Sequence, residues 1–134
     1  MPTMLTVYRI EAQGKELYGE YLAKRKVEYV RNLPGVKQFQ VFRRARRLEP
    51  ESPSEEFDFD IVAVIDVDDV EAFQAVRDGQ DYDDFRQEYV HLLEPKPVPI
   101  YEAERIECEP GAGLSAEEFW SQHTDPTRGE SNAR

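Results

Sequence analysis

His91 and His123 are the two histidines of the chain, and histidine is the side chain that most readily exchanges protons near neutral pH. An unperturbed pKa of about 6.5 suits a general base. His91 falls in a predicted helix two residues after Tyr89, so the two side chains point about 200° apart around the helix axis. Tyr89 shares the core-facing side with other apolar residues. A boundary or surface histidine is therefore the favoured interpretation of His91, and a catalytic base is the alternative.

Asp60 is a second candidate for proton transfer, because it interrupts the most apolar predicted strand. A lone buried carboxylate is costly unless it is paired, so we expect a partner or a wet cavity around it. Neighbouring strands offer Arg9 and Arg43 as partners. An ion pair that only holds the fold is favoured over a pair that anchors a ligand and perturbs the carboxyl pKa.

Three tyrosines could present hydroxyl groups to a phenolic or carbonyl ligand: Tyr8, Tyr29 and Tyr89. Tyr8 falls in a predicted strand and is a candidate for moving a proton. Tyr29 and Tyr89 fall in predicted helices, where tyrosines more often serve packing alone. Together with Arg9 and Arg43 they form the predicted set of ligand contacts.

Several kinds of chemistry lack their motifs in this sequence. The glycines fall in turns and near the end of the chain, so no phosphate-binding loop is visible. Two histidines and the single Cys108 do not make a metal site, and one cysteine cannot form an internal disulfide. No nucleophile elbow is present. We expect neither a metal nor a cofactor.

Charge and hydropathy limit the kinds of partner that the protein is expected to bind. The formal net charge is −11, which disfavours nucleic acid. The basic clusters at residues 24–26 and 43–47 are interpreted as a solvated helix face and a solvated or ion-paired strand end. No apolar stretch is long enough to cross a membrane, and the first residues lack a signal peptide. The sequence thus favours a soluble cytoplasmic protein.

Hydrophobic periodicity predicts four strands and two long helices. The strands are expected at residues 5–10, 36–46, 57–67 and 98–106, and the helices at 16–32 and 69–93. Gly79 predicts a break in the second helix near residues 78–81. Pro97 and Pro99 make the fourth strand an edge strand. This βαββαβ order predicts an α+β, ferredoxin-like domain with a four-stranded antiparallel sheet and both helices on one face.

The third predicted strand is apolar on both faces over residues 61–65, as in a strand covered on both sides. Two helices can cover only one face of the sheet. A second copy of the sheet is the economical cover for the other, so we expect a homodimer. The domain is drawn at residues 1–108, followed by a linker and tail at 109–134 with a short helix at 115–122.

This layout resembles the dimeric α+β-barrel superfamily over about residues 4–106. The resemblance rests on the βαββαβ order, on the link LPGV at residues 33–36, and on the strand at residues 60–63 that leads through an acidic turn into the second helix. The closest layouts are those of EthD-like proteins, with tetracenomycin-type polyketide cyclases and antibiotic-biosynthesis monooxygenases as neighbours. The resemblance implies a face-to-face dimer and a small-molecule cavity between sheet and helices.

The resemblance leaves two hypotheses about function. The first is a cofactor-independent cyclase, isomerase or monooxygenase that acts on an apolar or aromatic small molecule. The second is a non-catalytic small-molecule binder or interaction protein of the same fold. Haem degradation is disfavoured, because the haem-degrading members of the superfamily use an asparagine, tryptophan and histidine set and the one tryptophan here, Trp120, falls in the tail. An open cavity with two or more polar groups would favour the enzyme.

Overall fold

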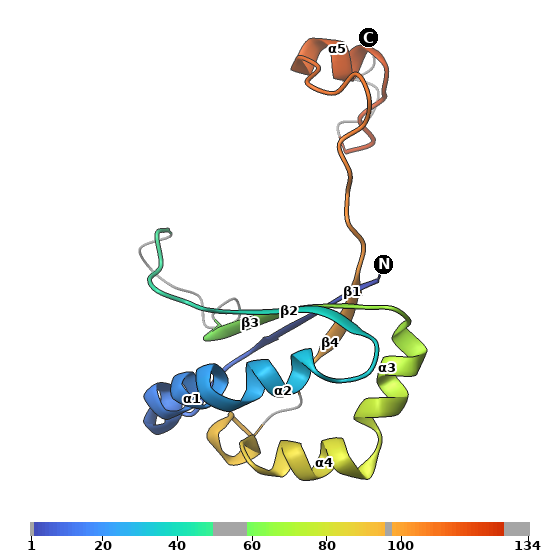
Figure 1. Ribbon diagram of the computed structural model, residues 1–134. Helices are drawn as coiled ribbons and strands as arrows, with labels where there is room; N and C mark the ends of the chain where they lie inside the picture. The colour runs from blue at the N-terminus through green and yellow to red at the C-terminus, as the bar shows by residue number, and fades with distance from the viewer. Residues whose placement is uncertain (1, 50–58, 96–97, 128–134) are drawn as a thin grey trace. The chain divides into compact units, whose positions relative to one another are not determined.

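The computed structural model describes residues 2–49, 59–95 and 98–127, and its chain divides into two compact units, residues 1–104 and 105–134 (Figure 1). The first unit holds a sheet of four strands: β1 (Thr3–Tyr8), β2 (Val36–Arg43), β3 (Ile61–Val67) and β4 (Ile100–Ala103). Their order is β2-β3-β1-β4, and every neighbouring pair is antiparallel. The predicted α+β, ferredoxin-like architecture is confirmed.

Three strands, β2, β3 and β4, are shorter than their apolar patterns predict, and β1 has the predicted length but begins two residues earlier. β1 ends at Tyr8, and β3 begins at Ile61, so Asp60 precedes the central strand and does not lie within it. The predicted strand start at residues 57–58 lies outside the described residues, as does Pro97. β4 pairs only with β1, which confirms it as an edge strand.

The first helical segment runs from Lys15 to Arg31 as three consecutive pieces: α1 (Lys15–Tyr21), the π-helical η2 (Leu22–Lys26) and α2 (Val27–Arg31). A short 3₁₀ turn, η1 (Ala12–Gly14), leads into it. A π-helix bonds residue i to i+5, so each residue turns the chain by less than in an α-helix. Buried side chains therefore recur at a spacing of four along one face, at Tyr18, Leu22, Lys26 and Val30.

The second helical segment is broken at Gly79, as predicted. α3 (Val70–Arg77) begins at Asp69, whose carboxylate accepts a hydrogen bond from the Ala72 amide at 3.1 Å. α4 (Gln80–Gln87) follows the break in a new direction, and the 3₁₀ turn η4 (Val90–Leu92) ends the segment (Figure 1). The break gives the segment two arms that both border the space beneath the sheet.

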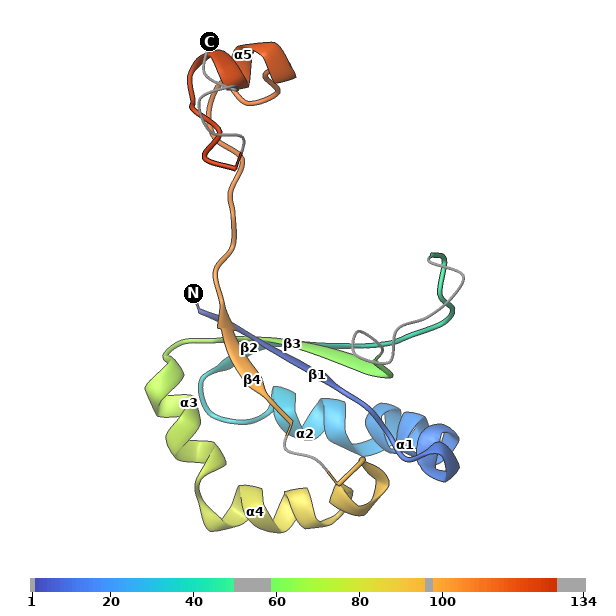
Figure 2. The ribbon, with the colours of Figure 1, turned by 180° about the vertical axis from the view of Figure 1, so that it is seen from behind.

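The two faces of the sheet have different surroundings. Helices α1 to α4 all lie on one side of it in both views (Figures 1 and 2). Met4, Phe39, Ile61 and Ile65 face these helices and are buried. The opposite face carries half-buried Leu5, Val7, Val62 and Val64 together with Phe42 and Tyr101, which are 52% and 57% exposed. It is an apolar face without helical cover among the described residues of the first unit.

The second unit contains one helix, α5 (Ala116–Ser121), among its described residues. Ser115 Oγ accepts a hydrogen bond from the Glu118 amide, and the Glu118 carboxylate accepts one from the Ser115 amide, which makes a capping box. Phe119 and Trp120 contact each other edge to face and are each more than two fifths exposed. No helix in the described part of the chain is long and apolar enough to cross a membrane.

Candidate functional site

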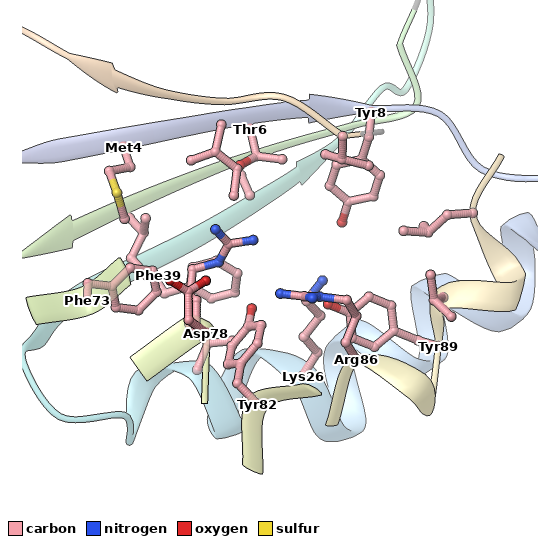
Figure 3. A pocket seen from close by; sticks show the side chains of 18 of the residues that line it. Met4, Thr6, Tyr8, Lys26, Phe39, Phe73, Asp78, Tyr82, Arg86 and Tyr89 are labelled. Carbon is pink, nitrogen blue, oxygen red and sulfur yellow. The ribbon is translucent and has the colours of Figure 1, made fainter. Parts of the chain in front are cut away.

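A cavity of about 470 Å³ lies between the sheet and the helices of the first unit (Figure 3). The inner face of the sheet supplies its roof through residues such as Met4, Thr6 and Tyr8. The helical segments and the residues that follow them supply its floor and its charged groups. The volume falls in the range of sites that enclose drug-sized molecules, about 300–1,000 Å³.

Lys26 is the polar centre of this cavity. Its side chain extends from η2, and the residue is only 8% exposed. Its Nζ donates a hydrogen bond to Tyr18 Oη at 2.8 Å and lies 3.9 Å from the centre of the Tyr89 ring. Tyr18 Oη shares a second hydrogen bond, also 2.8 Å long, with Tyr8 Oη. Lys26 and Tyr8 both line the cavity, and the fully buried Tyr18 joins them from behind.

Burial shapes the protonation of these three groups. Burial is the larger cause, and together with the positive charges of Arg77 and Arg86 it lowers the pKa of Lys26 to about 7. Burial raises the pKa of the Tyr8 and Tyr18 phenols well above the usual value. The amine thus carries a free lone pair in much of the population at neutral pH, while both phenols keep their protons. The site holds a base and a proton donor joined by hydrogen bonds.

Two arginines add positive charge to the cavity wall. The guanidinium carbons of Arg77 and Arg86 lie 5.7 Å and 5.3 Å from the centre of the Tyr82 ring. In Figure 3 the Arg86 and Lys26 side chains reach the same region from the helical side. Asp78 and Glu94 line the same cavity and supply negative charge. The wall therefore contains charged groups of both signs, and Lys26 is the most buried of them.

The sequence-predicted site residues fall in several places. Tyr8 and Tyr89 line the cavity. Tyr29 is outside the lining and stacks on Phe85 at a centroid distance of 3.8 Å. His91 is exposed on η4, on the outward side that its spacing from Tyr89 predicts, and it is also outside the lining.

The expected partners of Asp60 are wrong. Arg9 pairs with Glu94 at 3.4 Å, and Arg43 is exposed at the end of β2. Asp60 is buried and instead accepts a hydrogen bond from the Ile10 amide at 2.8 Å.

Two cations pair with the Asp60 carboxylate: Lys15 Nζ lies 3.2 Å and Arg44 Nη2 lies 3.7 Å from its Oδ1. Asp60 begins the connection into β3, where its own amide donates to the Tyr8 carbonyl. It does not line the cavity. The carboxylate is thus paired, as its burial predicts, by one cation at the start of α1 and one directly after β2.

Sequence reasoning missed the most distinctive group of the site. Residues 24–26 were expected to form a solvated basic face, which holds for Lys24 and Arg25 but is wrong for Lys26. The available signal is the spacing of four that links Lys26 to Tyr18, Leu22 and Val30. That spacing drifts out of phase in a regular α-helix of 3.6 residues per turn, and the π-helical stretch restores it.

Similarity to solved structures supports the fold. The HapK structure from Hahella chejuensis is 21% identical, with a TM-score of 0.60, over 87% of this chain and 99% of that one. An EthD family protein from Bacillus halodurans is 17% identical, with a TM-score of 0.58, over 79% of this chain and 100% of that one. A dimeric ferredoxin-like protein of unknown function from Thermobifida fusca is 14% identical, with a TM-score of 0.51, over 76% of this chain and 90% of that one.

These neighbours agree with the superfamily that the sequence resembles. Structures described as putative antibiotic biosynthesis monooxygenases are also similar. No curated protein matches the chain. The family model described as REDY-like protein HapK matches residues 5–105, which is most of the chain and all four strands except the first two residues of β1. The chain belongs to this HapK, REDY-like family.

Proposed function

We propose that the protein is a cofactor-independent enzyme that binds an apolar or aromatic carbonyl compound in the sheet-to-helix cavity and moves a proton on it. One observation carries the proposal: a buried lysine and a buried tyrosine line one cavity and are linked through the Tyr18 hydroxyl by two hydrogen bonds of 2.8 Å. Structural lysines seldom occupy such a position, because burial of an ammonium group is costly.

The protonation states of Lys26 and Tyr8 suit enolisation of a carbonyl compound. The neutral amine of Lys26 accepts a proton from the carbon next to the carbonyl group. The Tyr8 hydroxyl donates a hydrogen bond to the carbonyl oxygen, on which negative charge develops. Tyr18 holds the two groups in register, and the Tyr89 ring forms an apolar wall beside the amine. Ring closures and isomerisations of carbonyl compounds both begin with such a step.

Among the sequence-predicted site residues, the proposal keeps Tyr8 as the proton donor and Tyr89 as a ligand contact. It does not use Asp60, because that carboxylate is engaged by Lys15, Arg44 and the Ile10 amide outside the cavity lining. It does not use His91, which is exposed on η4. Arg9, Tyr29 and Arg43 are likewise outside the lining.

Hydrogen exchange tests this function without knowledge of the natural substrate. 2-Acetylnaphthalene carries an aromatic bicycle and exchangeable methyl protons next to a carbonyl group. The wild-type protein in D₂O should speed loss of the methyl signal in proton NMR. Lys26→Met should abolish the acceleration, and Tyr8→Phe should reduce it by about a hundredfold, as loss of a general acid does.

Lys24→Met and His91→Ala are the matched controls, since both side chains are exposed on helical segments outside the cavity. Both variants should exchange the ketone at the wild-type rate. Saturable binding of 2-acetylnaphthalene with no accelerated exchange would contradict the enzyme and support the non-catalytic binder.

A homodimer is proposed as the working assembly. It is supported by the apolar outer face of the sheet, where Leu5, Val62 and Val64 lie beside exposed Phe42 and Tyr101. Apolar surface of this extent is usually covered in soluble proteins. Sedimentation at micromolar concentration should give a dimer, and Val64→Lys should give a monomer. A monomeric wild-type protein would contradict the assembly.

A further inference from the structure

Among the residues that the structure describes, Lys26 is the only lysine that lines the cavity. The other three described lysines are all exposed, and each pairs with a carboxylate: Lys15 with Asp60, Lys24 with Glu20, and Lys37 with Asp68. None of the ion pairs between described residues includes Lys26. Its nitrogen meets the Tyr18 hydroxyl and three tyrosine rings, and no carboxylate of a described residue pairs with it to fix it as a permanent ammonium.

We infer that Lys26 acts as a nucleophile, and that its Nζ forms an imine with the carbonyl carbon of an aromatic aldehyde or ketone in the cavity. The inference rests on the proposed function, because it uses the same cavity and the same class of substrate. It goes beyond proton transfer, since the substrate becomes covalently attached. A protonated imine also draws electrons from the adjacent carbon more strongly than the carbonyl does.

The geometry supplies what each step of imine formation requires. The Nζ lone pair forms a C–N bond as the carbonyl π bond breaks. The carbonyl oxygen takes up a proton from the Tyr8 hydroxyl, and the nitrogen returns one to Tyr8 through Tyr18, which gives a neutral carbinolamine. The C–O bond then breaks, water leaves with a second proton from nitrogen, and a C=N bond forms. Amine and carbonyl give imine and water, so no oxidant or reductant takes part. Tyr8 can lend and recover the proton through Tyr18.

Charge around the amine favours the reactive form. Arg77 and Arg86 line the cavity, and their positive charges oppose protonation of Lys26. Asp78 and Glu94, which also line it, act in the opposite direction, and Glu94 is paired with Arg9. Burial adds to the effect of the arginines and brings the pKa of Lys26 to about 7. A neutral amine is therefore available at the pH at which aldehydes condense with amines.

Reductive trapping tests the inference. Full-length wild-type protein is incubated at pH 7 with 2-naphthaldehyde and sodium cyanoborohydride, which converts an imine into a stable secondary amine. Peptide mass spectrometry then locates the modified lysines. Modification should be at least about tenfold faster at Lys26 than at Lys15, Lys24 or Lys37, because a larger share of Lys26 is the neutral amine. Mapping on the wild-type protein makes the result independent of whether any variant folds.

Two variants sharpen the assignment. Lys26→Arg keeps a buried cation and should lose the fast phase of trapping. Tyr8→Phe keeps the ring and should slow modification of Lys26, while leaving modification of Lys24 unchanged. A structural role for Tyr8 alone would leave the rate at Lys26 unaffected.

The possible outcomes separate the inference from the proposed function. Modification spread evenly over the exposed lysines would overturn the imine, whether or not Lys26 is among them. If 2-acetylnaphthalene exchanges its protons while Lys26 stays unmodified by 2-naphthaldehyde, the imine is wrong and the proton-transfer enzyme stands. If Lys26 is trapped rapidly but exchange is absent, the imine stands and the proposed reaction is wrong.

Discussion

Lys26 and Asp60 are both charged side chains that the fold buries to the same degree, 8% exposed, yet their surroundings are opposite. Asp60 has the Ile10 amide, Lys15 and Arg44 around its carboxylate. Lys26 has phenols, aromatic rings and two nearby arginines of its own sign. The fold thus compensates one buried charge and leaves the other to be relieved by loss of its proton.

This difference separates a structural group from a reactive one. A carboxylate that accepts from a buried amide and from two cations lowers the free energy of the folded state only when it remains charged and in place. A buried amine that loses its proton gains a reactive lone pair in an enclosed space. Such a group can serve in chemistry, but its burial lowers the free energy of unfolding.

Lys26→Met should give the largest change, and the change should depend on pH. The pKa of Lys26 is about 7 in the folded state, against 10.5 in the unfolded chain. Between these values the unfolded chain binds one more proton, so wild-type stability should rise with pH by up to about 1.4 kcal/mol per pH unit. The variant lacks this dependence, so its free energy of unfolding should exceed that of the wild type most below pH 7, by about 5 kcal/mol.

Urea unfolding of both proteins at several pH values between 6 and 10 measures this difference. Lys24→Met is the control, because Lys24 is exposed and paired with Glu20 on the same helical segment. Its stability should run parallel to that of the wild type. A constant offset between Lys26→Met and the wild type across the whole range would show that Lys26 stays protonated in the fold.

Asp60→Ala should cost less, about 1–3 kcal/mol, because it leaves the buried Ile10 amide without its acceptor. Lys15 and Arg44 lose a counter-charge but can turn toward solvent. Asp68→Ala removes an exposed carboxylate paired with Lys37 and serves as the control, with an expected change below about 1 kcal/mol. Equal melting temperatures for Asp60→Ala and wild type would mean that Asp60 is solvated.

The fold was predictable because its signals are local. Gly79 breaks the second helical segment, Asp69 caps α3, and residues 61–65 are apolar on both faces, as in a central strand. Strand ends were less predictable, since apolar alternation continues beyond the paired residues. Asp60 illustrates this. It continues the alternating pattern of β3, but it precedes the strand, and its carboxylate accepts a hydrogen bond from the Ile10 amide.

The site was less predictable than the fold, because it depends on contacts between distant elements. Tyr8 and Tyr89 could be proposed from their type, and both line the cavity. Lys26 could not be proposed in this way, since a lysine that follows Lys24 and Arg25 has the local pattern of a solvated helix face. Only the π-helical winding turns it inward, and no residue type in that stretch encodes the winding plainly.

Arg86→Gln should produce a smaller, directed change in the environment of Lys26. Loss of one like charge should raise the pKa of Lys26, by less than about one pH unit because burial is the larger cause. NMR titration of the Lys26 Cε signal measures it, with Lys26→Met for assignment. Arg25→Gln removes an exposed arginine that pairs with Glu88 and should leave the titration midpoint in place. A midpoint that falls in Arg86→Gln would contradict the repulsion.

Lys15→Met should have the smallest effect, because compensation of Asp60 is shared. Lys15 is nearly half exposed, and pairs of this kind contribute about 0–1 kcal/mol. The carboxylate keeps the Ile10 amide and Arg44 after the change. Unfolding of Lys15→Met, Asp60→Ala and the double variant forms a cycle, and its coupling term should be smaller than the loss from Asp60→Ala alone. A coupling as large as that loss would mean that one cation, and not a shared set of donors, keeps this buried carboxylate charged.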